Sequence, residues 1–73
     1  MESLRTYLNS LTTEQQFHFA RSCGTTIGYL RKAISRRQKI GGQIVRLLEE
    51  NSGGKVIASE LRPDIFPPAL AAA

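Results

Sequence analysis

The chain has 73 residues and a net charge of +4, which limits it to one small domain with little apolar material for a core. Its one cysteine, Cys23, cannot form an internal disulfide, and no apolar run approaches the ~20 residues of a membrane-spanning helix. Residues 31–39 hold five positive charges and no negative one, so they account for the whole excess. Such concentrated charge indicates a polyanionic partner, and a solvated basic face is the alternative.

The N-terminal part of the chain predicts two short helices. A first helix is expected over 3–11 with Ser3 as N-cap, because apolar residues recur there at helical spacing, namely Leu4, Tyr7, Leu8 and Leu11. A second helix is expected to begin at Thr12 or Thr13. Thr13 and Gln16 have the spacing of a capping box.

Three more features divide the middle of the chain. Gly24 should end the second helix near Cys23, because glycine tolerates the left-handed backbone that closes helices. A third helix, capped by Thr26, is expected to run to about Arg36. A fourth helix is expected over 42–51, with a Gly-Gly pair behind it.

The C-terminal part is less regular. Residues 55–62 predict either one helical turn or a short edge strand, and residues 67–73 an irregular, flexible tail. The expected fold is therefore all-α, a compact helix-turn-helix domain of four to five short helices in residues 1–66. Its predicted core is thin, which favours a homodimer, and consists of Leu4, Leu8, Phe17, Ala20, Cys23, Leu30, Ala33, Ile34, Ile44, Leu47, Leu48 and Leu61.

The spacing of small residues in the middle of the chain predicts the helix-turn-helix. Ala20 is small enough for two helices to cross closely, and Gly24 permits the sharp turn. Leu30 and Ala33 then face back into the first of the two helices. A second helix held in this way projects from the protein and can enter the major groove of DNA by its N-terminal end.

Two stretches of the chain resemble families of phage regulators. Residues 24–40, GTTIGYLRKAISRRQKI, are similar to the recognition region of Cro repressors of temperate phages, which carry a similar glycine, KAI and basic helix end. Residues 53–66, GGKVIASELRPDIF, are similar to the end of YdaS-type prophage regulators, although Ile57 stands where a Thr or Ser cap is usual. Together the resemblances cover about residues 13–66. They imply sequence-specific DNA binding in transcriptional control, usually as a dimer on a near-palindromic site.

The resemblance also implies the roles of individual residues. The third helix, residues 26–36, should enter the major groove and present to the bases Thr26, Ile27, Gly28, Arg31 and Lys32. Phosphate contacts are expected from Gln16, Thr25, Ser35, Arg36, Arg37 and Lys39. Arg31 could pair with a guanine or contact phosphate only. Lys32 is also expected, with Arg36, Arg37 and Lys39, as a clamp on the DNA backbone. Ile27 could touch a thymine methyl group or belong to the core.

The predicted function is a Cro-like prophage repressor that binds a double-stranded DNA operator as a homodimer, in the bacterial cytoplasm and associated with the nucleoid. The alternative is an antitoxin-type module that grips a partner protein through its DIFPPAL segment, residues 64–70. His18 has no Asp, Cys or second His at metal-binding spacing and no catalytic grouping appears, so no enzyme activity, cofactor, metal, membrane or small-molecule ligand is expected. The final LAAA, residues 70–73, is either a flexible end or a degradation tag.

Overall fold

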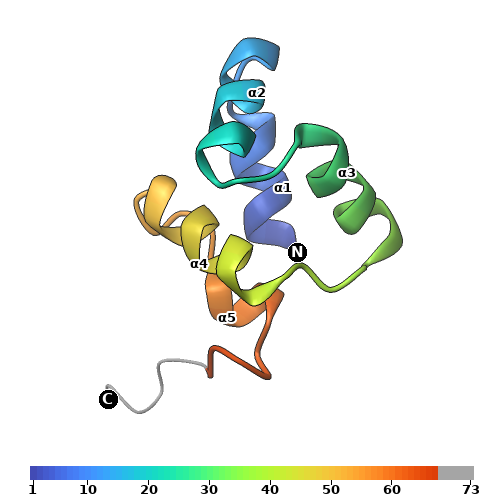
Figure 1. The fold of residues 1–73 in the computed structure, drawn as a ribbon, viewed down its shortest axis with the longest axis vertical. Coiled ribbons are helices and arrows are strands. Elements are labelled where there is room, and N and C mark those ends of the chain that lie inside the picture. Colours follow the sequence, from blue (N-terminus) through green and yellow to red (C-terminus); the bar gives the residue numbers. More distant parts are fainter. Residues whose placement is uncertain (68–73) are drawn as a thin grey trace.

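The computed structural model describes residues 1–67, and all regular structure in that range is helical (Figure 1). Its helices are α1 (Glu2–Asn9), α2 (Thr13–Ser22), α3 (Ile27–Arg36), α4 (Gly42–Asn51) and α5 (Ala58–Leu61). The predicted all-α domain is confirmed, and residues 55–62 contain a helical turn rather than a strand. Apart from Pro67, the predicted tail and degradation tag lie outside the described residues. None of these five helices is long and apolar enough to cross a membrane.

The arrangement of the helices leaves α3 at one edge of the molecule (Figure 1). Helix α2 packs against both α3 and α4, and α4 packs against α5. A helix-free link joins α3 to α4, and it sets α3 apart from the C-terminal helices (Figure 1). One face of α3 is therefore left uncovered by the rest of the described chain.

The turn between α2 and α3 has the geometry that the sequence predicts. Gly24 has a φ of 76°, in the left-handed region, and its backbone N–H donates to the Arg21 carbonyl at 3.0 Å. The Thr25 N–H donates to the Ala20 carbonyl, also at 3.0 Å. This pair of hydrogen bonds closes the helix in a Schellman motif. Ala20 itself is fully buried, as the close crossing of two helices requires.

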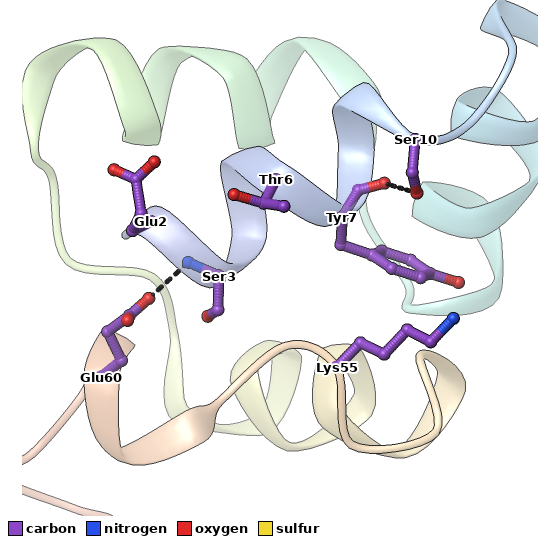
Figure 2. A pocket seen from close by; sticks show the side chains of 7 residues that line it. All are labelled: Glu2, Ser3, Thr6, Tyr7, Ser10, Lys55 and Glu60. Atoms are coloured by element: carbon purple, nitrogen blue, oxygen red, sulfur yellow. Dashed lines mark hydrogen bonds between the residues drawn. The ribbon is translucent and has the colours of Figure 1, made fainter.

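Ser3 is not the N-cap of the first helix, and that prediction is wrong. It lies inside α1, where its backbone N–H donates to Glu60 Oε1 at 2.7 Å (Figure 2). The Ser3 hydroxyl accepts from the Ile57 N–H at 3.1 Å, and Glu49 Oε2 accepts from the Ala58 N–H at 3.0 Å. The first N–H groups of α5 are thus satisfied by distant residues, so α5 forms without a Thr or Ser at position 57.

The capping box of α2 lies one residue earlier than predicted. Thr12 Oγ1 accepts from the Gln15 N–H at 3.1 Å, and Gln15 Oε1 accepts from the Thr12 N–H at 2.9 Å. Thr13 is the first helical residue and Gln16 has other partners. The box uses Gln15 and not Gln16 because the partly buried Gln16 amide donates to the Leu8 carbonyl of α1. Gln16 is therefore not available to cap the start of α2.

Replacing Thr12 with alanine should lower the free energy of unfolding by about 1 kcal/mol, because the N-cap hydroxyl is lost. Replacing Thr13, which has the same side chain and makes no capping bond, is the matched control. Urea unfolding followed by circular dichroism measures both variants. Equal losses for Thr12→Ala and Thr13→Ala would contradict the observed register of the box.

The core agrees with the prediction at most positions. The residues confirmed as buried are Leu4, Leu8, Ala20, Cys23, Leu30, Ala33, Leu48 and Leu61, whereas Ile34, Ile44 and Leu47 are partly buried at its edge. The prediction that Phe17 belongs to the core is wrong, since Phe17 is 48% exposed. Its place is taken by Phe19, which packs edge-to-face on Tyr7 with ring centroids 4.9 Å apart. Residues that the prediction missed are Phe19, Ile40, Val45, Val56 and Ala58.

Arg62 ties the end of the described chain to the link between α3 and α4. Its guanidinium donates to the Ile40 carbonyl at 2.8 Å and holds both Asp64 carboxylate oxygens, at 3.0 and 2.8 Å. Phe66 packs against the core nearby. Residues 62–66 are therefore part of the folded domain and help to fix where α3 ends and α4 begins.

The Arg62–Asp64 contact should make stability depend on pH in acid. The hydrogen bonds from Arg62 hold the pKa of Asp64 at about 2, below its ordinary value of 3.8. Because the folded pKa is the lower one, the contact stabilises the fold above about pH 4, and this contribution disappears as the pH falls through about 2. The melting temperature of Asp64→Asn should lie below that of the wild type at pH 5, and the gap should close towards pH 2. A gap that stays constant across this range would refute the assignment.

Candidate nucleic-acid interface

Helix α3 has one buried side and one exposed basic side. Leu30 and Ala33 face the core. At about 100° per residue, Lys32 lies roughly half a turn from Leu30, and the residues around it are exposed. The whole helix, IGYLRKAISR, contains no acidic residue. Tyr29 and Arg31, next to Leu30 in the chain, are exposed at the two flanks of the helix. We call the exposed residues between these flanks, with the N-cap, the α3 face, which consists of Thr26, Gly28, Lys32, Ser35 and Arg36.

The predicted base-facing residues occupy different places. The Thr26 hydroxyl caps α3 by accepting from the Tyr29 N–H at 3.1 Å. Gly28 is exposed, and the nearest atom to a Cβ built there is the Thr26 hydroxyl oxygen at 4.0 Å, so the α3 backbone is open to close approach. Lys32 is exposed and has no ion pair within residues 1–67. Ile27 is half-buried and packs against the core.

The predicted phosphate-contacting residues lie mostly around this face. Ser35, Arg36, Arg37 and Lys39 are exposed, and Thr25 is half-buried in the turn. The one ion pair described among them joins Lys39 Nζ to Asp64 at 4.0 Å, with the lysine side chain 77% exposed. A contact so long and so open to solvent leaves the ammonium group available to another anion.

The side chains of Gln16 and Arg31, both predicted to contact DNA, are hydrogen-bonded to each other. The Gln16 amide donates to the carbonyls of Leu8 at 2.8 Å and Leu11 at 3.4 Å. Its Oε1 accepts from Arg31 Nη2 at 2.6 Å. In the free protein the Gln16 N–H groups therefore connect α2 to the end of α1, and its oxygen holds the Arg31 guanidinium.

The Gln16–Arg31 pair borders a small hollow where α1, α2 and α3 meet. We call it the α1–α3 hollow; it has a volume of about 250 Å³. Its polar lining consists of Arg5, Asn9, Gln16, Arg31 and Ser35. Sequence reasoning missed Arg5 and Asn9, because Glu2 cancels the charge of Arg5 in any count along the chain. Their i, i+4 spacing, which places both on one side of α1, was the available signal.

A comparison with known proteins decides the family. Over 64 residues the chain is 39% identical to a prophage transcriptional regulatory protein of Escherichia coli strain K12, and the match covers 88% of this chain and 97% of that protein. The chain belongs to the family of this prophage regulator. It is therefore a transcriptional regulator of the prophage type. No family model matches the chain, and no solved structure matches it significantly.

The prophage regulator has a second, larger hollow on the other side of α1. This α1–α5 hollow of about 530 Å³ is lined by Glu2, Ser3, Thr6, Tyr7, Ser10, Lys55 and Glu60 (Figure 2). Partial burial tends to raise the pKa of the Glu60 carboxyl, but hydrogen bonds from Ser3 and the charge of the N-terminus outweigh it and lower the pKa. The α1–α5 hollow thus has two carboxylates and one ammonium group in its lining, whereas residues 31–39 carry five positive charges and no negative one. The excess positive charge of the regulator therefore lies on α3 and the link behind it.

Cys23 has a structural role in the regulator. It is fully buried at the end of α2, and its sulfur accepts a long hydrogen bond of 3.6 Å from the Asn51 side chain. Burial raises the pKa of the Cys23 thiol, and the bond from Asn51 offsets part of that rise. A buried, protonated thiol is a poor nucleophile. The contact joins the helix-turn-helix to the end of α4.

Proposed function

We propose that this regulator binds a specific double-stranded DNA operator by inserting α3 into the major groove, as a Cro-like repressor does. The observation that supports this most strongly is the α3 face. It carries Lys32 and Arg36 with no acidic residue on the helix, and it stands at an edge of the molecule (Figure 1). A helix held by a helix-turn-helix at an open edge can enter a groove that is wide enough for an α-helix.

The structure supports different roles for the predicted base readers. Lys32, at the middle of the α3 face, is the proposed base reader, since a lysine can donate to guanine O6 or N7. Thr26 and the exposed backbone at Gly28 are proposed to approach the base edges near the start of the helix. Ile27 is packed against the core, which favours the core role over contact with a thymine methyl group.

The remaining basic residues are proposed to hold the DNA backbone. Arg36, Arg37 and Lys39 follow one another towards the end of α3 and into the link, with Ser35 beside them. Contacts of this kind fix the register of a protein on the duplex without reading its sequence. A homodimer is proposed to bind a near-palindromic operator, with half-sites about one helical turn, or ~34 Å, apart.

Selection from a random duplex library tests the proposal. The regulator should recover one preferred duplex with two related half-sites, and affinity should fall steeply as salt rises. Lys32→Ala should lose preference at one base pair of each half-site. Binding that is equal for all duplexes at moderate salt would reject specific recognition.

A protein-binding role, as in an antitoxin, is the second candidate. Ile57 and Ile65 are 45% and 47% exposed and line a hollow of about 370 Å³ with Phe66 and Pro67. Truncation after Pro63 would not test this role cleanly, because it removes the Asp64 carboxylate that Arg62 holds. Replacing Ile57 and Ile65 with serine is the sharper test. Loss of a co-purified partner protein with operator affinity retained would favour this second role.

A further inference from the structure

Arg31 lies closer to the buried side of α3 than Lys32 does. At about 100° per residue it lies a quarter of a turn from the buried Leu30, whereas Lys32 lies about half a turn away. The 2.6 Å bond to Gln16 Oε1 directs its guanidinium towards the junction with α1 and α2. Arg31 is thus held at the flank of the α3 face, where a backbone phosphate beside the groove would pass, and not at its centre.

The Gln16 amide is well suited to hold Arg31 in this position. Its amide nitrogen donates to the Leu8 carbonyl in α1 and to the Leu11 carbonyl in the link that follows, so the carbonyl oxygen is the end left to face Arg31. A guanidinium has five N–H donors, and the bond to Gln16 uses one of them. The others remain available for an anion.

Arg5 supplies a second cation to the same hollow from α1. It lines the α1–α3 hollow together with Asn9 and Ser35. Its ion pair with Glu2 is 3.7 Å long and its side chain is 56% exposed, and such surface pairs are weak. Among the described residues 1–67, no carboxylate lines the hollow. Two guanidinium groups with amide and hydroxyl donors, and no acid, match an oxygen-rich anion.

We propose that the α1–α3 hollow seats one phosphate of the DNA backbone between Arg5 and Arg31. This rests on the proposed function, and it adds α1 to the DNA-binding surface. It assigns Arg31 to phosphate contact rather than to guanine. Gln16 is then a positioning residue, which acts by holding Arg31.

Three single variants test the proposal on the selected operator, namely Arg5→Ala, Arg31→Ala and the control Arg46→Ala. Arg46 lies on α4 outside the hollow and has a comparable exposed ion pair, to Glu50 at 3.4 Å, so all three variants lose one positive charge. In the homodimer each variant loses one phosphate contact per half-site, so the salt slope should fall by about 1.8. The variant's affinity should then fall about twelvefold less than that of the wild type between 50 and 200 mM salt. Arg5→Ala and Arg31→Ala should show this change with base preference unaltered. Arg46→Ala should match the wild type.

Neutral methylphosphonate substitution, one linkage at a time, locates the phosphate. One linkage per half-site should weaken the wild type most. The same linkage should weaken Arg5→Ala and Arg31→Ala less, because each variant has already lost one of the two guanidinium contacts to that phosphate. Inorganic phosphate at constant ionic strength should not compete; competition at millimolar concentration would overturn the assignment in favour of a free anion. A wild type that binds no duplex would instead refute the proposed function. Binding by the wild type with equal losses for Arg5→Ala and Arg46→Ala, or a relaxed base preference in Arg31→Ala, would overturn the phosphate assignment alone.

Discussion

Replacing Leu30 with alanine should lower the free energy of unfolding by about 2–5 kcal/mol, since it removes three buried carbon atoms and leaves a cavity. Leu30 is fully buried on the side of α3 that faces the core. At about 0.05–0.15 kcal/mol per residue, a domain of this size has about 4–11 kcal/mol of stability in all, so this loss is a large part of it. Urea unfolding followed by circular dichroism should show a much lower midpoint, and operator binding should be lost as α3 loses its anchor.

Leu47→Ala is the matched control for Leu30→Ala. It is the same substitution on a helix of equal length, but Leu47 is only partly buried at the edge of the core. Its loss should therefore be clearly smaller. An unfolding midpoint for Leu30→Ala that equals that of Leu47→Ala would contradict the placement of Leu30 between α3 and the core.

Replacing Arg37 with glycine should raise stability and weaken operator binding together. Arg37 ends α3 with a φ of 54° and a ψ of 38°, a left-handed conformation that costs a residue with a side chain about 1–2 kcal/mol. Within residues 1–67 it is the one non-glycine residue with a positive φ, and the equivalent turns after α2 and α4 use Gly24 and Gly53. Strain that persists beside a proposed binding surface indicates that the side chain is needed there.

The two effects of Arg37 can be measured separately. Arg37→Gly should gain about 1 kcal/mol of unfolding free energy, since part of the relieved strain is offset by the greater freedom of glycine in the unfolded chain. Its affinity for the operator should fall, with a salt slope lower by about 1.8, since the homodimer loses one phosphate contact in each half-site. Arg37→Lys, which keeps both the charge and the strain, is the control and should resemble the wild type in both measurements. An Arg37→Gly variant with unchanged affinity would remove Arg37 from the DNA contacts.

The helices and the central turn could be predicted because their signals are local. Gly24 ends α2, Thr26 caps α3, and Leu30 and Ala33 are buried as expected. Each of these features depends on residues within four positions along the chain. The capping box was predicted one residue too late because two pairs in the sequence have the required spacing. Thr12 with Gln15, the pair that forms the box, differs from the predicted Thr13 with Gln16 only in register.

The failures occur where a distant residue decides the outcome. Phe17 and Phe19 are two positions apart on α2, and the ring of Tyr7 on α1 selects Phe19 for the core. Ile40 and Val56 are buried outside any helix, so helical periodicity could not find them. The role of Gln16 was unreadable for the same reason, since its partners Leu8, Leu11 and Arg31 belong to other elements or links.

The α3 face is the surface proposed to meet the operator. Titration of the isotope-labelled regulator with the selected duplex, followed through backbone amide resonances, locates the contact surface. We expect the largest changes at Gly28, Lys32 and Ser35, with little change around Lys55 and Glu60 in the α1–α5 hollow. Large changes confined to α5 and the α1–α5 hollow, with the resonances of α3 unmoved, would contradict this proposal.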